Sequence, residues 1–331
     1  MVNLATPEDY VNGVLKGDRR VLSKTITIIE SALDRHKDMA RAIIDQLLPH
    51  AGKAVRLGIT GVPGVGKSTF IENFGMALIR QGHKVAVLAV DPSSTRSGGS
   101  IMADKTRMEQ LAVQADAFIR PSPSGGTLGG VARKTRETML VCEAAGFDVM
   151  IVETVGVGQS ETAVASMVDF FLVLMLAGAG DELQGIKKGV LEMADAIAIT
   201  KADGDNVDKA RQAARAYASA LHLLSPASAH WQPPVLTCSA VTLEGVDAVW
   251  QTVLDHRRKM QASGEFDIKR RGQALDWLQA LVDEGLRERF LKHPKIRQHF
   301  PRYQREVARG DASPTVAANE LLFFLDNPQS P

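Results

Sequence analysis

The chain has 331 residues, and its 39 lysines and arginines nearly balance 38 aspartates and glutamates, which gives a formal net charge of +1. This balance offers no electrostatic reason to expect a nucleic-acid partner, and no apolar run approaches the roughly 20 residues that span a bilayer. Its two cysteines fit a reducing compartment better than a disulfide framework. We therefore expect a soluble, cytoplasmic protein with one large domain and smaller appendages.

Apolar periodicity divides the chain into three parts. Residues 1–50 alternate apolar and charged positions at helical spacing, which predicts an N-terminal helical extension. In residues 51–262, short β-branched runs alternate with helix-length segments, the pattern of an α/β protein with a mostly parallel central sheet flanked by helices. The expected strands are 55–60, 84–90, 117–120, 148–153, 170–176, 196–200 and 234–237. Residues 263–331 read as charged amphipathic helices broken at Pro294, Pro301 and Pro314.

The strongest local motif is GVPGVGKS, which satisfies G-x-x-x-x-G-K-[ST] between an expected strand and an expected helix. Its glycines let backbone N–H groups curl around a β-phosphate, and the helix N-terminus adds partial positive charge. Lys67 would bridge the β- and γ-phosphates, and Ser68 would give Mg²⁺ a hydroxyl ligand. A ligand-free glycine turn is the alternative, which the complete motif disfavours. The expected phosphate-binding residues are Gly61, Val62, Pro63, Gly64, Val65, Gly66, Lys67, Ser68 and Thr69.

Two aspartates follow the second expected strand. Asp91, in the run DPSS, stands at the carboxyl end of a strand beside the phosphate loop, where ligands gather in open α/β sheets. Asp104 follows in a polar stretch as a second candidate. The alternatives are that Asp91 caps a turn before Pro92 and that Asp104 begins a solvated helix. We rank both aspartates first as ligands of Mg²⁺ or of its waters.

An acid followed by a glycine three residues later, ETVG, ends the fourth expected strand. In P-loop switches the acid organises metal-bound water and the glycine N–H contacts the γ-phosphate, although a plain strand-end carboxylate is the alternative. Val157 stands where Ras-like proteins carry a water-orienting glutamine, so slow intrinsic hydrolysis is expected, and Gln159 and Glu161 lie close behind. The candidates for a catalytic role are Lys67, Asp91, Asp104, Glu153 and Gly156, and those for Mg²⁺ are Ser68, Asp91, Asp104 and Glu153.

The run TKAD after the strand 196–200 indicates the base. Asp203 can accept hydrogen bonds from the ring N1–H and the amine of guanine, whereas adenine offers no such donor pair. Lys201 can lay its stem along the base, and the later run CSA would give the guanine carbonyl a backbone N–H. Thr200 replaces the usual Asn and so removes an amide that ties this loop to the phosphate loop. Either run alone also fits a plain turn. The expected base-binding residues are Thr200, Lys201, Asp203, Ser239 and Ala240.

Taken in chain order, GVPGVGKST, AVDPSS, VETVGVGQSE, GAGDELQGIKKG and TKAD resemble the MeaB/ArgK family of G proteins, over about residues 10 to 320. The resemblance implies a P-loop NTPase fold and a GTPase that uses GTP, GDP and Mg²⁺. It also implies a GTP-gated chaperone for adenosylcobalamin-dependent acyl-CoA mutases, chiefly methylmalonyl-CoA mutase, which helps to load intact cofactor and protects the mutase from inactivation.

The same resemblance implies two further features. The run GAGDELQGIKKG would be an additional switch that relays the nucleotide state to the mutase, with a solvated loop as the alternative. Its expected coupling residues are Asp181, Glu182, Gln184, Lys187 and Lys188. The C-terminal helices would be a dimerisation arm that joins a homodimer, although apolar residues such as Leu275 and Leu278 also fit an ordinary packed helix face.

Two other functions remain as alternatives. One is a P-loop kinase or ATPase linked to amino-acid transport, and Asp203 with the CSA run disfavours it because both indicate guanine. The other is a metal-insertion GTPase, which would need His and Cys at ligand spacing. The eight histidines are scattered and the two cysteines stand in apolar surroundings, so this function is also disfavoured.

Overall fold

The computed structural model describes residues 5–90, 108–121, 128–154, 160–177, 188–223 and 228–326. The chain forms two compact units, Met1–Gln273 and Ala274–Pro331. Among the described residues no helix combines the length and the apolar composition that a membrane span requires.

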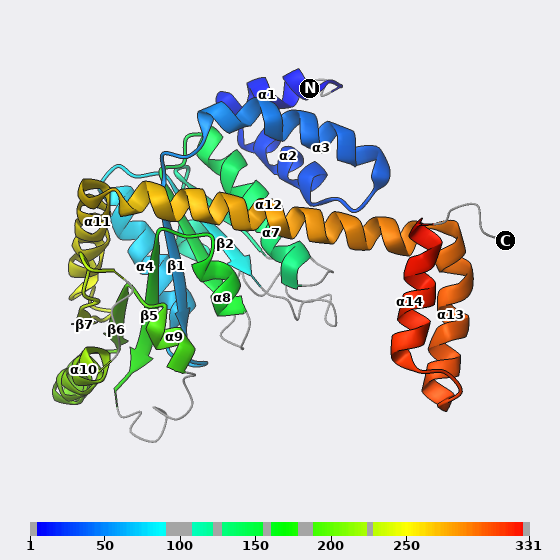
Figure 1. Cartoon of the computed structure of the whole chain (residues 1–331). Coiled ribbons are helices and arrows are strands. Elements are labelled where there is room, and N and C mark those ends of the chain that lie inside the picture. The colour runs from blue at the N-terminus through cyan, green and yellow to red at the C-terminus, as the bar shows by residue number, and fades with distance from the viewer. Residues whose placement is uncertain are drawn as a thin grey trace. The chain divides into compact units, whose positions relative to one another are not determined.

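The first unit is built on a seven-stranded sheet of order β3-β2-β4-β1-β5-β6-β7, in which every neighbouring pair is parallel (Figure 1). The strands are β1 Val55–Gly61, β2 Val85–Val90, β3 Ala117–Arg120, β4 Val149–Thr154, β5 Phe170–Leu176, β6 Ala196–Thr200 and β7 Val235–Thr237. Each expected strand is therefore found within one residue at either end. Long apolar runs predict these strands well because a parallel sheet is buried on both faces.

Helices cover both faces of the sheet. One apolar core joins the sheet to α1 Pro7–Leu15, α2 Arg19–Glu30, α3 Asp34–Leu47, α7 Leu128–Ala144, α8 Ser160–Ala165 and α10 Val207–His222. The other joins it to α4 Lys67–Arg80, α6 Glu109–Ala112 and α11 Val246–Ser263. Short helical segments complete the described part of this unit: η1 Leu48–His50, α9 Lys188–Glu192 and η3 Gly204–Asn206. The expected α/β architecture with helices on both sides of the sheet is confirmed.

The N-terminal helices belong to the same compact unit as the sheet. The Asp18 side chain accepts from the backbone N–H groups of Arg20 and Val21 and so caps α2. Val21 and other apolar residues of α1 to α3 lie in the core that includes α7. An ion pair between Arg120 of β3 and Glu30 at the end of α2 adds a polar tie. The helical extension expected from residues 1–50 is thus packed onto one face of the sheet.

The C-terminal helices are α12 Glu265–Lys292, α13 Pro294–Arg309 and α14 Pro314–Asp326. Pro294 and Pro314 begin α13 and α14, where a missing N–H costs nothing. The expected break at Pro301 was wrong, because Pro301 lies inside α13. The helix continues across the proline and packs against α14 (Figure 1). The rings of His299 in α13 and Phe324 in α14 stack with centroids 4.9 Å apart.

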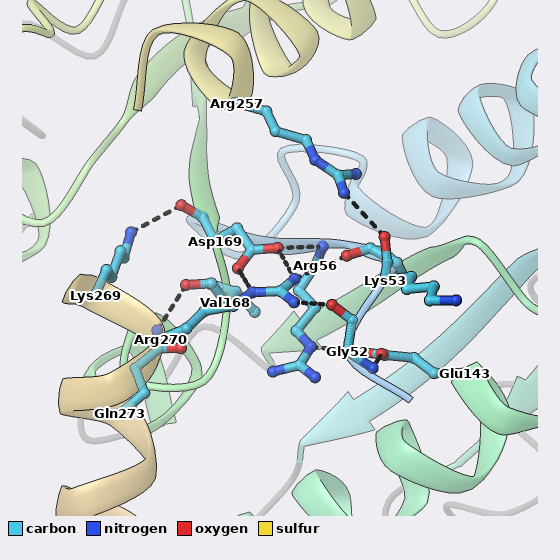
Figure 2. Close-up of polar contacts among 11 residues, drawn as sticks. Gly52, Lys53, Arg56, Glu143, Val168, Asp169, Arg257, Lys269, Arg270 and Gln273 are labelled. Carbon is cyan, nitrogen blue, oxygen red and sulfur yellow. Dashed lines mark hydrogen bonds and ion pairs between the residues drawn. The ribbon is translucent and has the colours of Figure 1, made fainter. Parts of the chain in front are cut away.

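A buried ion network ties the first two turns of α12 to the amino-terminal ends of β1 and β5 (Figure 2). Asp169, just before β5, accepts from Arg270 Nε at 2.8 Å and from a terminal guanidinium nitrogen at 2.7 Å, and its Oδ2 also accepts from the Arg56 N–H at 3.0 Å. Arg270 donates in addition to the Ala54 carbonyl at 2.8 Å. Burial alone would lower the pKa of Arg270, but the hydrogen bonds and charge of Asp169 outweigh it and hold that pKa above its ordinary value.

Replacing Asp169 by alanine is expected to lower the free energy of unfolding by about 3–5 kcal/mol, because it leaves the buried Arg270 guanidinium without its counter-charge. Urea denaturation measures this change. Asp255→Ala is the matched control: Asp255 pairs with Arg258 at 2.9 Å on an exposed surface, where such a pair contributes under about 1 kcal/mol. Equal losses in the two variants would contradict a stabilising role for the buried network.

Candidate functional site

The loop between β1 and α4 has a backbone that only glycine adopts without strain at two points. Gly64 and Gly66 have φ angles of 79° and 90°. Gly61 needs a glycine for a different reason, since a Cβ there would lie 2.6 Å from the Leu174 carbonyl oxygen of β5. The loop closes with a hydrogen bond from the Val65 N–H to the Val62 carbonyl at 3.2 Å. The glycine spacing of the sequence motif is therefore a requirement of this backbone path.

Lys67 begins α4 and turns back over the loop. Its Nζ donates to the Gly61 carbonyl at 2.7 Å, which places the ammonium at the carboxyl edge of β1. Burial lowers the pKa of Lys67 below its ordinary value, and the negative charges of Glu153 and Glu161 oppose this shift. A half-buried ammonium at the N-terminus of a helix is suited to hold an anion.

The carboxyl end of β4 lies beside the loop, because β4 pairs directly with β1. Glu153 is opposite Ile59 of β1 and opposite Ala89 of β2, so its carboxylate is at the same sheet edge as Lys67. The buried Thr154 hydroxyl donates to the Thr60 hydroxyl at 2.7 Å and joins the two strand ends. Ser68, the expected hydroxyl ligand, is half-buried in the first turn of α4.

Thr200 ties the end of β6 to the phosphate loop. Its hydroxyl donates to the Val65 carbonyl, the nearer acceptor at 2.9 Å, with the Met175 carbonyl at 3.2 Å. The replacement of Asn by Thr200 was expected to remove the link between this loop and the phosphate loop. The Thr200 hydroxyl makes that link instead. Lys201 supplies a second link, because its Nζ donates to the Gly64 carbonyl at 3.0 Å. The Lys201 backbone has a φ of 55°, and the Asn206 side-chain amide donates to the Lys201 carbonyl.

Replacing Thr200 by valine is expected to weaken guanine-nucleotide binding by about fivefold to tenfold, because an isosteric side chain keeps the packing and loses the hydrogen bond to the loop. Titration calorimetry measures the affinity. Thr200→Ser keeps the hydroxyl and serves as the control, which should bind within about twofold of the unchanged protein. A serine variant as weak as the valine variant would assign the loss to packing.

Asp203 is held by the loop that follows β7. The fully buried Ser239 donates its hydroxyl to Asp203 Oδ2 and accepts from the backbone N–H groups of Val241 and Thr242 at 3.2 and 3.1 Å. The backbones also join, since the Ala202 N–H donates to the Cys238 carbonyl at 3.1 Å. Asp203 is therefore oriented by a buried serine that is itself fixed by two backbone hydrogen bonds. The TKAD and CSA runs, which are expected to recognise the base, lie together.

Several expected residues fall outside the described part of the chain: Asp91, Asp104, Gly156, Asp181, Glu182, Gln184 and Lys187. Lys188 begins α9, and only its backbone is described. The described members, from the phosphate loop, Glu153, the TKAD run and the CSA run, gather at the carboxyl edge of the sheet. Glu161 is buried, has no role expected from the sequence, and carries a negative charge that opposes the lowering of the Lys67 pKa by burial. In the sequence, the one hint of a role for this residue was its position at the end of the GQSE run.

A parallel sheet whose first strand enters a G-x-x-x-x-G-K-S loop, with a TKAD loop tied to it, defines a P-loop nucleotide-binding protein. The family model described as methylmalonyl Co-A mutase-associated GTPase MeaB matches residues 22–295. The chain belongs to this family, and it is a GTPase. GTPase ArgK of Escherichia coli is 48% identical over 98% of both chains.

Two further comparisons extend this result. The mitochondrial methylmalonic aciduria type A homolog of Mus musculus is 47% identical, over 94% of this chain and 77% of that protein. A solved structure described as the LAO/AO transport system kinase is 41% identical, with a TM-score of 0.76 over 98% of this chain and 99% of the other. The expected family and fold class are therefore confirmed.

Proposed function

We propose that GTP and GDP bind with their phosphates in the loop 61–69 and their base between Lys201 and the loop at Ser239. The observation that carries this assignment is the linkage of the two loops. Thr200 and Lys201 both donate to phosphate-loop carbonyls, and Ser239 holds Asp203 in place. A base seated on Asp203 is thereby connected to the phosphate site through hydrogen bonds.

Mg²⁺ would accompany the nucleotide. Ser68 and Glu153 present hydroxyl and carboxylate oxygens at one sheet edge, and oxygen donors are the ligands that this hard cation prefers. Asp91 and Asp104 would complete the set directly or through water. When bound, the ion would neutralise charge on the β- and γ-phosphates. Lys67 would then hold the same phosphates from the other side, and the Gly156 N–H would contact the γ-phosphate.

Hydrolysis is expected to be slow without a partner, because Val157 stands where a water-orienting glutamine is found in Ras-like proteins. We propose that the partner is adenosylcobalamin-dependent methylmalonyl-CoA mutase. The family is described as methylmalonyl Co-A mutase-associated, and the mouse relative is named for methylmalonic aciduria. The chain would act as a GTP-gated chaperone that controls cofactor loading and protects the mutase from inactivation.

The run GAGDELQGIKKG follows β5 in the sequence, and β5 pairs with β1, the strand that leads into the phosphate loop. We infer that Asp181, Glu182, Gln184, Lys187 and Lys188 form a switch that contacts the mutase. Order and disorder of such a charged, glycine-punctuated segment is a common way to couple nucleotide to partner.

The test is a GTPase assay of the purified chain with and without methylmalonyl-CoA mutase, preceded by titration with GDP, a GTP analogue and an ATP analogue. Guanine-selective binding with stimulated hydrolysis is the expected result. Preference for the ATP analogue would favour the kinase alternative linked to amino-acid transport, a description that the solved relative carries. Guanine binding with no response to the mutase would contradict the proposed client and leave metal insertion to be tested.

We further propose that residues 263–331 form an arm that joins two copies of the chain. Leu275, Leu278, Val282 and Leu286 are all exposed on α12, and all four recur at the spacing of one helix face. An exposed apolar stripe of this kind is typical of an interface. Sedimentation equilibrium of the full chain tests the proposal, which a monomer at micromolar concentration would contradict.

A further inference from the structure

The four residues that join α8 to β5, residues 166–169, are held by side chains from two other helices. Met167, Val168 and Asp169 are buried, and buried backbone carbonyls need hydrogen-bond donors. The carbonyl groups of three of the four residues accept from side chains of α7 and α12. We call residues 166–169 the α8–β5 connector.

Arg136 of α7 contacts the connector and α12 at the same time. One terminal nitrogen donates to the Ser166 carbonyl at 2.8 Å and to the Ser166 hydroxyl oxygen at 2.9 Å. The other terminal nitrogen donates to the Gln273 carbonyl of α12 at 2.9 Å. Because the guanidinium is planar and rigid, it sets the distance between its two partners. Arg136 therefore joins the residue that follows α8 to the third turn of α12.

Gln273 closes a ring of contacts. Its side-chain amide donates to the Val168 carbonyl at 2.8 Å, while its backbone carbonyl accepts from Arg136. Lys269, one turn earlier on α12, donates to the Asp169 carbonyl at 2.8 Å, and Figure 2 shows that both side chains reach the connector. The first three turns of α12 are thus bonded to the connector directly, and through Arg136 to the end of α8.

α8 lies between the connector and the proposed nucleotide site. In the sequence it begins at Ser160, four residues after Gly156, whose N–H is proposed to contact the γ-phosphate. α8 and the connector also pack on β1, the strand that leads into the phosphate loop. A Cβ built on Gly58 of β1 would be 2.9 Å from Val164 Cγ1 and 3.0 Å from Val168 Cγ2. Contacts this close leave α8 and the connector little room to move independently.

We propose that Arg136 is a positioning residue that couples the nucleotide state to α12. When α8 shifts between the GDP and GTP states, the Ser166 end of the connector shifts with it, and Arg136 and Gln273 transfer the change to α12. This helix runs from Glu265 to Lys292 and continues into the second compact unit. The inference deepens the proposed function and rests on it, because it requires that the nucleotide bind at the phosphate loop.

Hydrogen–deuterium exchange of the full chain, saturated with GDP or with a non-hydrolysable GTP analogue, measures how firmly α12 is held in each state. In the unchanged chain, the amides of residues 270–277 should exchange at rates that differ by about fivefold between the two states. Arg136→Gln removes the fork that joins the two segments, so this difference should fall below about twofold. A purely structural role would raise exchange equally in both states and preserve the difference.

Arg257→Gln is the matched control, because Arg257 donates to the Lys53 carbonyl at 2.9 Å, outside the connector. It should keep the difference of about fivefold. Gln273→Met loses the bond to Val168 and should reduce the difference to about twofold to threefold, and Arg136→Gln with Gln273→Met should be no lower than Arg136→Gln alone. Thermal unfolding shows which variants are folded. If Arg136→Gln does not fold, Gln273→Met decides, and an undiminished difference there overturns the inference.

Equal exchange of residues 270–277 in the two states of the unchanged chain would overturn the inference, as would a difference that persists in folded Arg136→Gln. Titration calorimetry of the same samples separates this outcome from failure of the proposed function. If the chain binds GDP and the GTP analogue but exchange is equal, the nucleotide site stands and only the coupling is wrong. If neither nucleotide binds, the nucleotide assignment fails and the coupling fails with it.

Discussion

Replacement of Lys67 by alanine is expected to weaken GTP and GDP binding by at least about 100-fold and to abolish measurable hydrolysis. The Lys67 ammonium is half-buried at the carboxyl edge of β1 and donates a hydrogen bond to the Gly61 carbonyl, so it lies beside the loop expected to hold the phosphates. A nucleotide that loses it loses both a charge-assisted hydrogen bond and the nearest positive charge. Titration calorimetry and a phosphate-release assay measure the two effects.

The control for this variant is Lys209→Ala, which removes a lysine from the exposed side of α10. It should leave affinity and hydrolysis unchanged, because the charge of an exposed lysine is screened by solvent. Lys67→Arg separates charge from shape: the broad guanidinium does not enter the space of an ammonium, so it should restore little activity. Normal GTP affinity in Lys67→Ala would mean that the loop does not hold the phosphates.

Replacement of Asp203 by asparagine is expected to exchange the base that the protein prefers. Guanine presents two donors, N1–H and the amine, and an amide in place of the carboxylate turns one acceptor into a donor that faces the amine. GTP affinity should therefore fall by about 100-fold or more. Xanthine carries a carbonyl where guanine carries the amine, so xanthosine triphosphate should bind to the variant more tightly than GTP does. Competition titration with both nucleotides measures the exchange.

Asp205→Asn is the matched control, since Asp205 is exposed only two residues further on. It should keep the preference for GTP. The Asp203 variant also retains its hydrogen-bond partner, because the Ser239 hydroxyl can donate to the amide oxygen as it does to the carboxylate. If Asp203→Asn lost affinity for GTP and for xanthosine triphosphate alike, the loop would have collapsed. That result would contradict direct recognition of the base by Asp203.

Some features could be predicted from the sequence because their signals are local. Apolar runs identified the strands of a sheet buried on both faces, and the strand ends agree with expectation to one residue. The glycines of the loop could be predicted because the backbone requires them. Gly64 and Gly66 have positive φ angles, and a side chain at Gly61 would meet the Leu174 carbonyl of β5. Proline was read correctly where it begins a helix, at Pro294, and wrongly at Pro301, which lies inside α13.

Other features depend on residues that are far apart in the chain. The substitution of Thr200 for Asn was read as the loss of a link, whereas its hydroxyl reaches Val65, 135 residues away, because β6 ends beside the phosphate loop. The Asp169 pair with Arg270 spans 101 residues and gives no periodic signal.

By itself the sequence determined the class of fold and the family, and it singled out the runs expected to hold the phosphates and the base, because each of these is encoded in short runs whose spacing is set by backbone geometry. Only the tertiary structure decided which charges and hydroxyls lie together. At the carboxyl ends of the strands the Thr200 hydroxyl bonds to the loop after β1, and at the amino-terminal ends of β1 and β5 Asp169 pairs with Arg270. These contacts stabilise the fold because solvent is excluded where distant segments pack together.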